Sequence, residues 1–273
     1  MPSAGQVRPT IFTLNPFAPL ARGLVFAGLG CAPGTYLYKD SAKESKGNNG
    51  TLTNMDPLTD WVWVPQLGRW GTDHDGSNDT IPTPLSASND TFTFATWANG
   101  LSTSHESMAG NGDADPYKTL LVGIYAAQFY AFIGDGTNYD QAYGTLTASA
   151  DGLHHYTVTR SGSATPIFYQ DGKQLSTTGT TTKTSTFTFN VVPVGYRAGT
   201  GKRADGCLWN RVLSAAEIAA LADPSNAMLK SGGIPLIAPS PRRLWAVGAG
   251  GGGGFAGWPM ILDEMAMTGG IRE

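Results

Sequence analysis

Short runs of alternating apolar and polar residues, separated by turn-forming residues, restrict the fold of this chain more than any other sequence feature. Phe92–Trp97 and His155–Arg160 alternate in this way, as half-buried strands do. Lys118–Tyr125 and Gln128–Gly134 form two more predicted strands, so close together that a hairpin must join them. The 36 glycines and 17 prolines supply turns between such strands. The regular spacing favours an antiparallel β-sandwich over alternating strands and helices.

The second half of the chain continues the same pattern. Ile167–Gln170 is followed by Asp171-Gly172, a dipeptide that is strongly typical of a two-residue hairpin turn. Two further strands are predicted, over Thr186–Asn190 and over Val191–Tyr196. The sequence therefore predicts an all-β fold, with strands that are short and mostly joined by tight turns.

One short helix interrupts this pattern. Ser214–Glu217 has the spacing of a capping box, in which the serine hydroxyl and the glutamate carboxylate each accept a hydrogen bond from an otherwise unpaired backbone N–H. Leu213 and Ile218 occupy the positions of a hydrophobic staple. Asp223-Pro224 should end the helix, because proline cannot continue it.

Composition excludes several classes of partner. Only 14% of residues are charged, the net charge is −3, and no run of Lys or Arg is available to neutralise phosphates, so we expect no nucleic-acid partner. No stretch approaches the roughly 18 apolar residues of a membrane span. The two cysteines, Cys31 and Cys207, do not form a disulfide framework or a zinc site. They are either two buried thiols or one bridge between the first and last strands.

The chain divides into three parts by composition and strand pattern. Residues 1–22 are Pro-rich and predict an extended N-terminal arm, residues 23–223 hold the strand pattern, and residues 224–273 form a Pro- and Gly-rich C-terminal arm. The final segment is apolar and Met-rich, which suits docking onto a neighbouring subunit. The predicted assembly contacts in this arm are Arg242, Arg243, Trp245, Phe255, Trp258, Ile261 and Leu262.

Five blocks of sequence resemble the laminin-G-like/concanavalin-A-like jelly-roll family, in that family's order. The blocks are Asn48–Asn54, Asp75–Ile81, Asp151–Arg160, Tyr169–Lys173 and Trp209–Ile218. The resemblance spans about residues 23–222 and departs from the usual pattern at Leu153, where tryptophan is common. It implies a two-sheet antiparallel jelly-roll sandwich with one short helix and extended arms at both ends.

The flanking segments resemble open reading frames of tailed bacteriophages. This resemblance rests on Asn15–Phe17 and on Pro241–Trp245 with the glycine run that follows. It implies a non-enzymatic virion structural protein, such as a capsid decoration or a fibre- or tail-associated component, made in the host cytoplasm and placed at the particle surface. Its expected partners are other virion proteins and copies of itself.

Catalysis and metal binding find little support in the residues. Glycosidases of this fold need two carboxylates across a cleft, yet the five glutamates are scattered and Glu217 is used in the helix cap. His154 and His155 are adjacent on a strand and point to opposite faces, so they cannot chelate one ion together. Asp73–Asp79 superficially resembles a calcium loop but is predicted to be a strand entering a turn. We expect no cofactor; calcium is the one metal with candidate ligands, Asp113 and Asp115.

A lectin-like function is the alternative to a structural one. Sugar sites combine an aromatic face with amide and carboxylate groups that bond to hydroxyls. Tyr139, flanked by Asn138 and Asp140, has this chemistry and is the predicted glycan-binding group; Tyr117 and Tyr143 are similar. The ligand would be a surface or matrix glycan.

Overall fold

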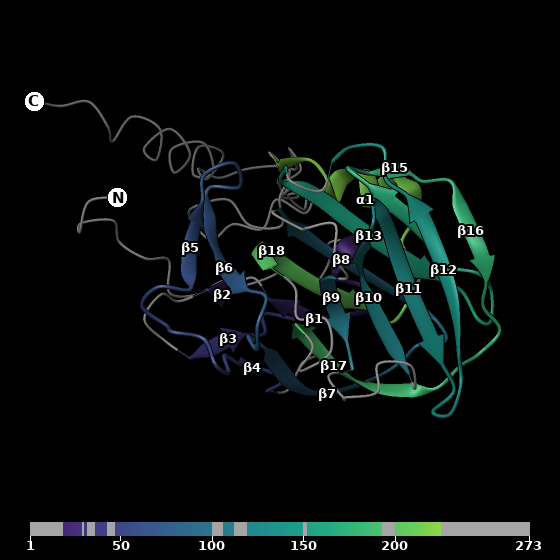
Figure 1. The fold of residues 1–273 in the computed structure, drawn as a ribbon, viewed down its shortest axis with the longest axis horizontal. Coiled ribbons are helices and arrows are strands. Elements are labelled where there is room, and N and C mark those ends of the chain that lie inside the picture. The colour runs from purple at the N-terminus through teal and green to yellow at the C-terminus, as the bar shows by residue number, and fades with distance from the viewer. Residues whose placement is uncertain are drawn as a thin grey trace, which may run out of the picture. The chain divides into compact units, whose positions relative to one another are not determined.

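The alternating runs fold into two antiparallel β-sheets that pack face to face (Figure 1). They are seen in a computed structural model, which describes residues 19–28, 30–31, 36–42, 47–99, 106–111, 119–149, 152–192 and 200–224. The two arms predicted at the ends of the chain lie almost entirely outside the described residues. Within the described part, no helix is long and apolar enough to cross a membrane.

The first sheet has eight strands. Its order is β15 (Lys173–Gln174), β14 (Ile167–Gln170), β13 (His154–Arg160), β8 (Phe92–Ala98), β18 (Thr200–Trp209), β6 (Arg69–Asp75) and β5 (Trp61–Val64), with β1 (Leu24–Gly28) also paired to β18. The long strand β18 pairs with β6 through its first half and with β1 through its second half. The start and the end of the sandwich are therefore neighbours in one sheet.

The second sheet has seven strands. Its order is β16 (Thr177–Thr180), β12 (Tyr139–Thr145), β11 (Gln128–Gly134), β10 (Leu120–Tyr125), β9 (Glu106–Gly110), β17 (Thr186–Val192) and β7 (Ile81–Ser88). A small three-stranded sheet consists of β2 (Gly30–Cys31), β3 (Leu37–Lys39) and β4 (Gly50–Thr51). This architecture confirms the predicted all-β sandwich.

Aromatic side chains from the inward faces of both sheets form the main core. Phe129 of β11 lies 5.1 Å from Phe168 of β14, measured between ring centroids. Phe189 of β17 lies 5.2 Å from Phe26 of β1 and 6.1 Å from Phe94 of β8. All five rings are buried, and their contacts join the two sheets directly. Burying a side chain of this size stabilises a fold by about 1.5–3 kcal/mol.

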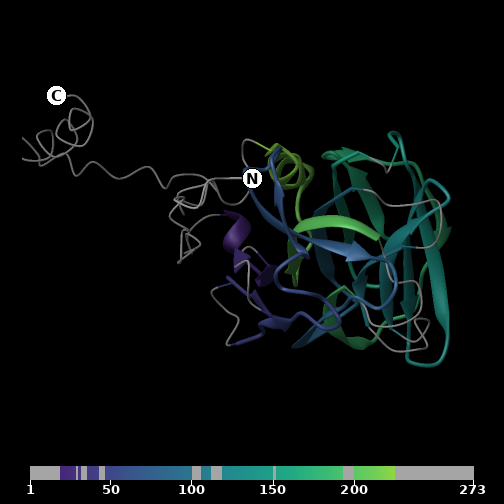
Figure 2. The same ribbon diagram turned by 60° about the vertical axis from the view of Figure 1, so that its left-hand side comes forward.

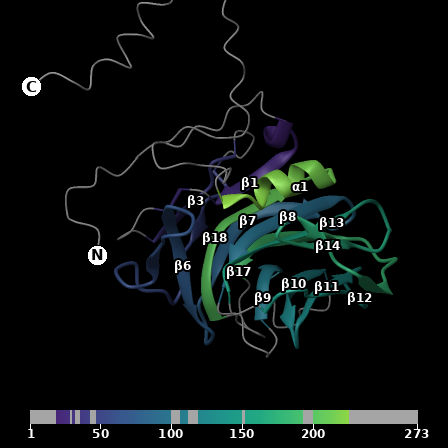
Figure 3. The same cartoon turned by 90° about the horizontal axis from the view of Figure 1, so that it is seen from above.

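A second, smaller apolar layer covers the outer face of the eight-stranded sheet. The 3-10 helix η1 (Pro19–Ala21) and the helix α1 (Ala215–Leu221) lie on this face, away from β9–β12 (Figures 2 and 3). Ile218 and Leu221 of α1 pack with Trp209 of β18 in this layer. The capping box is present as predicted, and the helix ends at Leu221.

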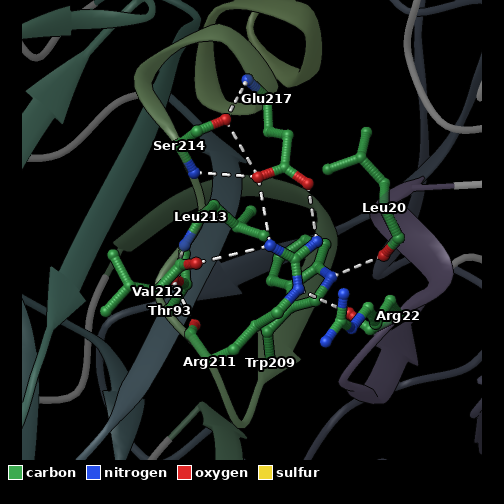
Figure 4. A network of polar contacts seen from close by, with 9 residues as sticks. All are labelled: Leu20, Arg22, Thr93, Trp209, Arg211, Val212, Leu213, Ser214 and Glu217. Carbon is green, nitrogen blue, oxygen red and sulfur yellow. Dashed lines mark hydrogen bonds and ion pairs between the residues drawn. The ribbon is translucent and has the colours of Figure 1, made fainter.

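Arg211 ties the first described segment of the chain to α1 (Figure 4). Its guanidinium makes two bonds to the carboxylate of Glu217, of 2.6 and 3.0 Å, and its Nε donates to the carbonyl of Arg22 at 2.6 Å. Beside it, the indole N–H of Trp209 donates to the carbonyl of Leu20 at 2.7 Å. The bonds from the Arg211 guanidinium stabilise the charged carboxylate of Glu217 and are the main reason that its pKa is lowered to about 2.

Asn89 occupies the corner where the chain passes from the seven-stranded sheet to the eight-stranded sheet. Its side-chain amide donates to the carbonyls of Thr119 at 2.7 Å and Gly134 at 3.0 Å, and accepts from the N–H of Ser185 at 2.6 Å. Its own carbonyl accepts a 2.7 Å bond from the buried guanidinium of Arg160. One buried residue thus connects loops of one sheet with the end of a strand in the other.

Several local predictions are confirmed. The strands β11 and β14 have the predicted bounds. Asp171 and Gly172 have φ values of 52° and 76°, the left-handed pair that a type I′ hairpin turn requires. Asp73–Asp79 is a strand that enters a turn after Asp75.

One strand prediction is wrong. The sequence predicts a break between Asn190 and Val191, but β17 runs through both residues to Val192, and residues 193–199 lie outside the described part. The strand continues because Asn190 and Val192 still pair with Pro82 and Ile81 of β7, and the Asn190 amide oxygen also accepts a bond from the N–H of Thr83. The Asn190 side chain thus takes part in the pairing between β17 and β7.

We expect Asn89→Ala to destabilise the protein strongly. The substitution would remove the hydrogen bonds of this side chain and leave the N–H of Ser185 without its partner, whereas the carbonyls of Thr119 and Gly134 would keep bonds from the Gly134 N–H and the Ser185 hydroxyl. A lost hydrogen bond costs about 0.5–1.5 kcal/mol, and a donor left unpaired costs about 1–3 kcal/mol. The free energy of unfolding, measured by urea denaturation, should fall by about 2 kcal/mol or more. Asn138→Ala, at an exposed turn position, is the matched control and should change it by less than about 0.5 kcal/mol. A loss below about 1 kcal/mol for Asn89→Ala would contradict this role of Asn89.

We expect the Arg211–Glu217 pair to stabilise the fold in a pH-dependent way. Because the folded-state pKa of Glu217 is lowered to about 2, the stabilisation is complete above the unfolded-state value and is lost as the pH falls through about 2. Glu217→Gln should lower the free energy of unfolding by about 1–2 kcal/mol at pH 7, after allowance for partial solvent screening. The difference from the wild type should shrink below about pH 4 in denaturant titrations. A pH-independent difference would show that the charge is not responsible.

Candidate functional site

The outer face of the seven-stranded sheet carries a cluster of aromatic side chains. On β11, Phe129, Ala131 and Ile133 face the core, so Tyr130 and Phe132 face outward. The stacked rings of Tyr130 and Phe132 have centroids 4.7 Å apart. Strict alternation along one strand thus separates the structural core from an outer aromatic layer.

The next strand, β12, adds to this outer layer through its register with β11. Tyr143 lies opposite Tyr130, and Gln141 lies opposite Phe132. The ring of Tyr139 lies 5.5 Å from that of Phe132. Because cross-strand partners share a face, the side chains of Tyr139, Gln141 and Tyr143 all point outward.

The side chains on this face become more exposed to solvent from β11 towards the edge strand β16. Tyr130 and Phe132 are buried, whereas Tyr139, Gln141 and Tyr143 are half-buried. The edge strand β16 continues the face with two exposed threonines: Thr180 lies opposite Gln141 and Thr178 lies opposite Tyr143. We call these five accessible side chains the aromatic strip: Tyr139, Gln141, Tyr143, Thr178 and Thr180.

The structure separates the three residues that the sequence groups as a glycan site. Tyr139 belongs to the aromatic strip, and Asn138 is exposed in the turn before β12. Asp140 follows Tyr139 directly on the strand, so its side chain points to the opposite face. The Asp140 carboxylate accepts bonds from the N–H groups of Thr182 at 2.7 Å and Lys183 at 3.3 Å. Partial burial works to raise the pKa of Asp140, but these bonds outweigh it and lower that pKa.

The sequence analysis did not predict that Gln141, Thr178 and Thr180 belong to the candidate site. The signal for Gln141 was present, because Tyr139, Gln141 and Tyr143 recur with the period of two that one face of a strand requires. The threonines could not be placed from the sequence, since β16 lies 32 or more residues further along the chain and pairs with β12 only in the folded state. Tyr143 had been noted by its chemistry, and Tyr117 lies outside the described residues.

The two adjacent histidines have structural roles. His155 is buried with its ring centroid 5.1 Å from that of Trp97, and burial lowers its pKa to about 4. His154 bonds through Nδ1 to the carboxylate of Asp171 at 2.7 Å. His155 is thus buried and His154 half-buried on opposite faces of the strand, as the predicted alternation requires.

Metal binding has no support within the described part of the chain. No group of three or more His, Cys, Asp or Glu side chains there could hold an ion. The calcium candidates Asp113 and Asp115 lie outside the described residues. In the Asp73–Asp79 segment, the Asp79 carboxylate accepts a 2.9 Å bond from the N–H of Asp75.

Other predicted features also fall outside the described residues. These are the assembly contacts Arg242, Arg243, Trp245, Phe255, Trp258, Ile261 and Leu262, together with the side chain of Cys31. Cys207 is buried on the outer side of the eight-stranded sheet. It lines a small cavity beneath α1 that has room for about one water molecule. That cavity is too small for a sugar.

Glu217 is unsuited to the acid role in glycoside hydrolysis. A general acid must remain protonated near neutral pH, which requires a raised pKa. The pair with Arg211 lowers the pKa of Glu217 to about 2 instead. Glu217 therefore caps α1 and binds Arg211, which in turn holds the first described segment of the chain.

Comparisons with known proteins agree with this architecture. A family model described as "Concanavalin A-like lectin/glucanases superfamily" matches residues 74–219. No curated protein matches the sequence. Three similar solved structures share the fold at low sequence identity. They are the binding domain of Paraclostridial Mosquitocidal Protein 1 (15% identity, TM-score 0.52), Trypanosoma rangeli sialidase with the inhibitor DANA (16%, 0.52) and the receptor binding domain of a botulinum neurotoxin C/D mosaic serotype (11%, 0.52).

The matches cover most of this chain but a smaller fraction of each similar structure. The matches cover 76%, 73% and 77% of this chain, in the same order. The chain spans about half of each toxin domain, 53% and 52%, and 32% of the sialidase. At these identities the likeness concerns the fold alone.

Proposed function

Because the chain belongs to the concanavalin A-like lectin/glucanases superfamily, we propose that it is a carbohydrate-binding protein that holds a glycan on the outer face of its seven-stranded sheet. The observation that carries this proposal is the aromatic strip, where two half-buried tyrosines flank an amide on one strand. Aromatic rings offer apolar faces to the C–H side of sugar rings, and amides and hydroxyls exchange hydrogen bonds with sugar hydroxyls. The strip combines both kinds of group.

The spacing along β12 suits an extended ligand. Tyr139 and Tyr143 are four residues apart, so their Cα atoms are separated by about 13–14 Å in an extended strand. Gln141 lies midway, with Thr180 opposite it and Thr178 opposite Tyr143 on the edge strand. The two rings would therefore contact different sugar units of one chain, with the polar groups reading the hydroxyls between them.

The ligand should be held without being cleaved. In the described part of the chain, the outward side chains of the strip include no carboxylate, and Glu217 is an ionised structural group. The similar toxin domains are named as binding or receptor binding domains, which supports a binding role for this fold, whereas the sialidase is an enzyme. We therefore propose recognition rather than hydrolysis.

A structural role in a bacteriophage virion is the second candidate. Its support is the sequence of the flanks, above all Pro241–Trp245 and the apolar segment after the glycine run. In this role the protein would sit at the particle surface and dock onto other virion proteins, or onto copies of itself, through its C-terminal arm. A surface protein of this kind could also bind glycans, since many copies on one particle strengthen weak binding.

The glycan proposal is tested by alanine variants of the strip. Full-length protein is screened against a panel of oligosaccharides, and each affinity found is remeasured by calorimetry for Tyr139→Ala and Tyr143→Ala. Each variant should weaken binding by about tenfold or more, which corresponds to about 1.4 kcal/mol. Tyr36→Ala removes a 59% exposed tyrosine away from the strip and should leave the affinity unchanged.

Two results would count against the glycan proposal in different ways. If the wild type binds nothing on the panel, carbohydrate recognition itself is wrong. If it binds but the strip variants, shown to be folded by thermal denaturation, bind equally well, the site lies elsewhere.

The assembly proposal is tested by deleting residues 224–273. All described strands and helices end before this segment, so the truncated protein should stay folded and soluble. Light scattering should show an oligomer for the full chain and fewer copies for the truncated one. Equal masses would exclude self-assembly through the arm, and an insoluble truncation would show that the arm belongs to the core.

A further inference from the structure

The edges of the two sheets differ in how well they are protected against pairing with another strand. Exposed edges are usually shortened, charged or interrupted by proline. β7 carries Pro82 and Pro84, and β15 has two residues, one of them Lys173. β16 is polar and contains Gly179. β5, Trp61–Val64, has four residues but carries no charge, proline or glycine, because all of them are apolar.

The hydrogen-bond direction along β5 follows from one bond at its start. The N–H of Asp73 donates to the carbonyl of Asp60 at 2.8 Å, so these residues form a hydrogen-bonded pair between β6 and the residue before β5. Antiparallel pairs alternate, and Val62↔Gly71 is the next hydrogen-bonded pair. Trp63↔Trp70 is therefore a non-hydrogen-bonded pair, and the N–H and C=O of Trp63 point away from β6. In Figure 1, β5 lies at the outer end of its sheet.

The side chains around Trp63 hold this edge in an extended form. The rings of Trp63 and Trp70 pack edge to face with centroids 5.8 Å apart. Non-hydrogen-bonded pairs bring side chains closest, which favours such a contact. Both tryptophans and Val62 are half-buried. Among the residues that the structure describes, nothing bonds to the outward N–H or C=O of Trp63.

We propose that β5 pairs with β5 of a second copy of this chain, antiparallel about a two-fold axis at Trp63. In that register the N–H of each Trp63 donates to the carbonyl of the other, so one residue supplies both halves of a reciprocal pair. Val62 then lies opposite Val64 of the second copy. An edge without charge offers no like-charge repulsion to this self-pairing, and a two-fold interface needs only one self-complementary patch.

The other copy is favoured over an unrelated strand because the edge is complementary to itself. All four residues of β5 are apolar, so antiparallel pairing of two copies places each apolar residue of one strand opposite an apolar residue of the other. The two eight-stranded sheets would join into one continuous sheet. The aromatic strip belongs to the other sheet, and each copy keeps its own.

The experiment compares Val62→Lys with Val62→Thr in the full-length protein. Lysine places a charge on the edge, whereas threonine keeps a branched, neutral side chain, and Gly71 opposite is unchanged. Sedimentation over a concentration series should show Val62→Lys at half the mass of the wild type, with a dissociation constant of the dimer raised at least tenfold. Val62→Thr should have the mass of the wild type. Circular dichroism checks that both variants are folded.

Hydrogen exchange at the Trp63 amide identifies the occupant of the edge. Protection that rises with protein concentration supports pairing with a second copy. Protection at all concentrations with no loss of mass in Val62→Lys would overturn the proposal, because the edge would be covered by the protein's own chain. An unprotected amide, or equal masses for the two variants, would also overturn it.

Discussion

The fold depends on a buried amide at the corner where the chain crosses between its sheets. The Asn89 side chain bonds to backbone groups at or beside the ends of three strands of the seven-stranded sheet, and its backbone carbonyl accepts a bond from Arg160 of the eight-stranded sheet. Aromatic packing alone tolerates small slides of one sheet over the other, because dispersion contacts have no fixed direction. Hydrogen bonds of a buried amide have direction, so they fix where the sheets meet. The arginine at the end of β13 is thus explained by the architecture rather than by ligand binding.

Local signals in the sequence predicted local structure well. The Asp171-Gly172 turn, the capping box at Ser214 and the alternation of β13 each involve neighbours within a few residues. The role of Asn89 could not be predicted, because its partners lie 30, 45 and 96 residues away. For the same reason the strand end predicted at Asn190 was wrong, since the residues that pair with this part of β17 lie on another strand, β7.

The candidate site shows the same division. Tyr139 was found by its chemistry, but grouping it with Asp140 treated sequence neighbours as spatial neighbours, which a strand prevents. The residues that do accompany Tyr139 come from its own strand at a spacing of two and from the adjacent edge strand. Predicting the strip would have required the register of three strands, which depends on long-range pairing.

The placement of the two ends of the described segment has a practical consequence. Leu20 and Arg22 are fastened beside α1, so the described segment begins and finishes on the outer face of the eight-stranded sheet. The strip occupies the outer face of the opposite sheet. A carrier or label attached where the described segment begins, or where α1 ends, would therefore lie on the side of the sandwich opposite the tyrosines. The two ends of the described segment and the aromatic strip thus occupy opposite faces of the sandwich.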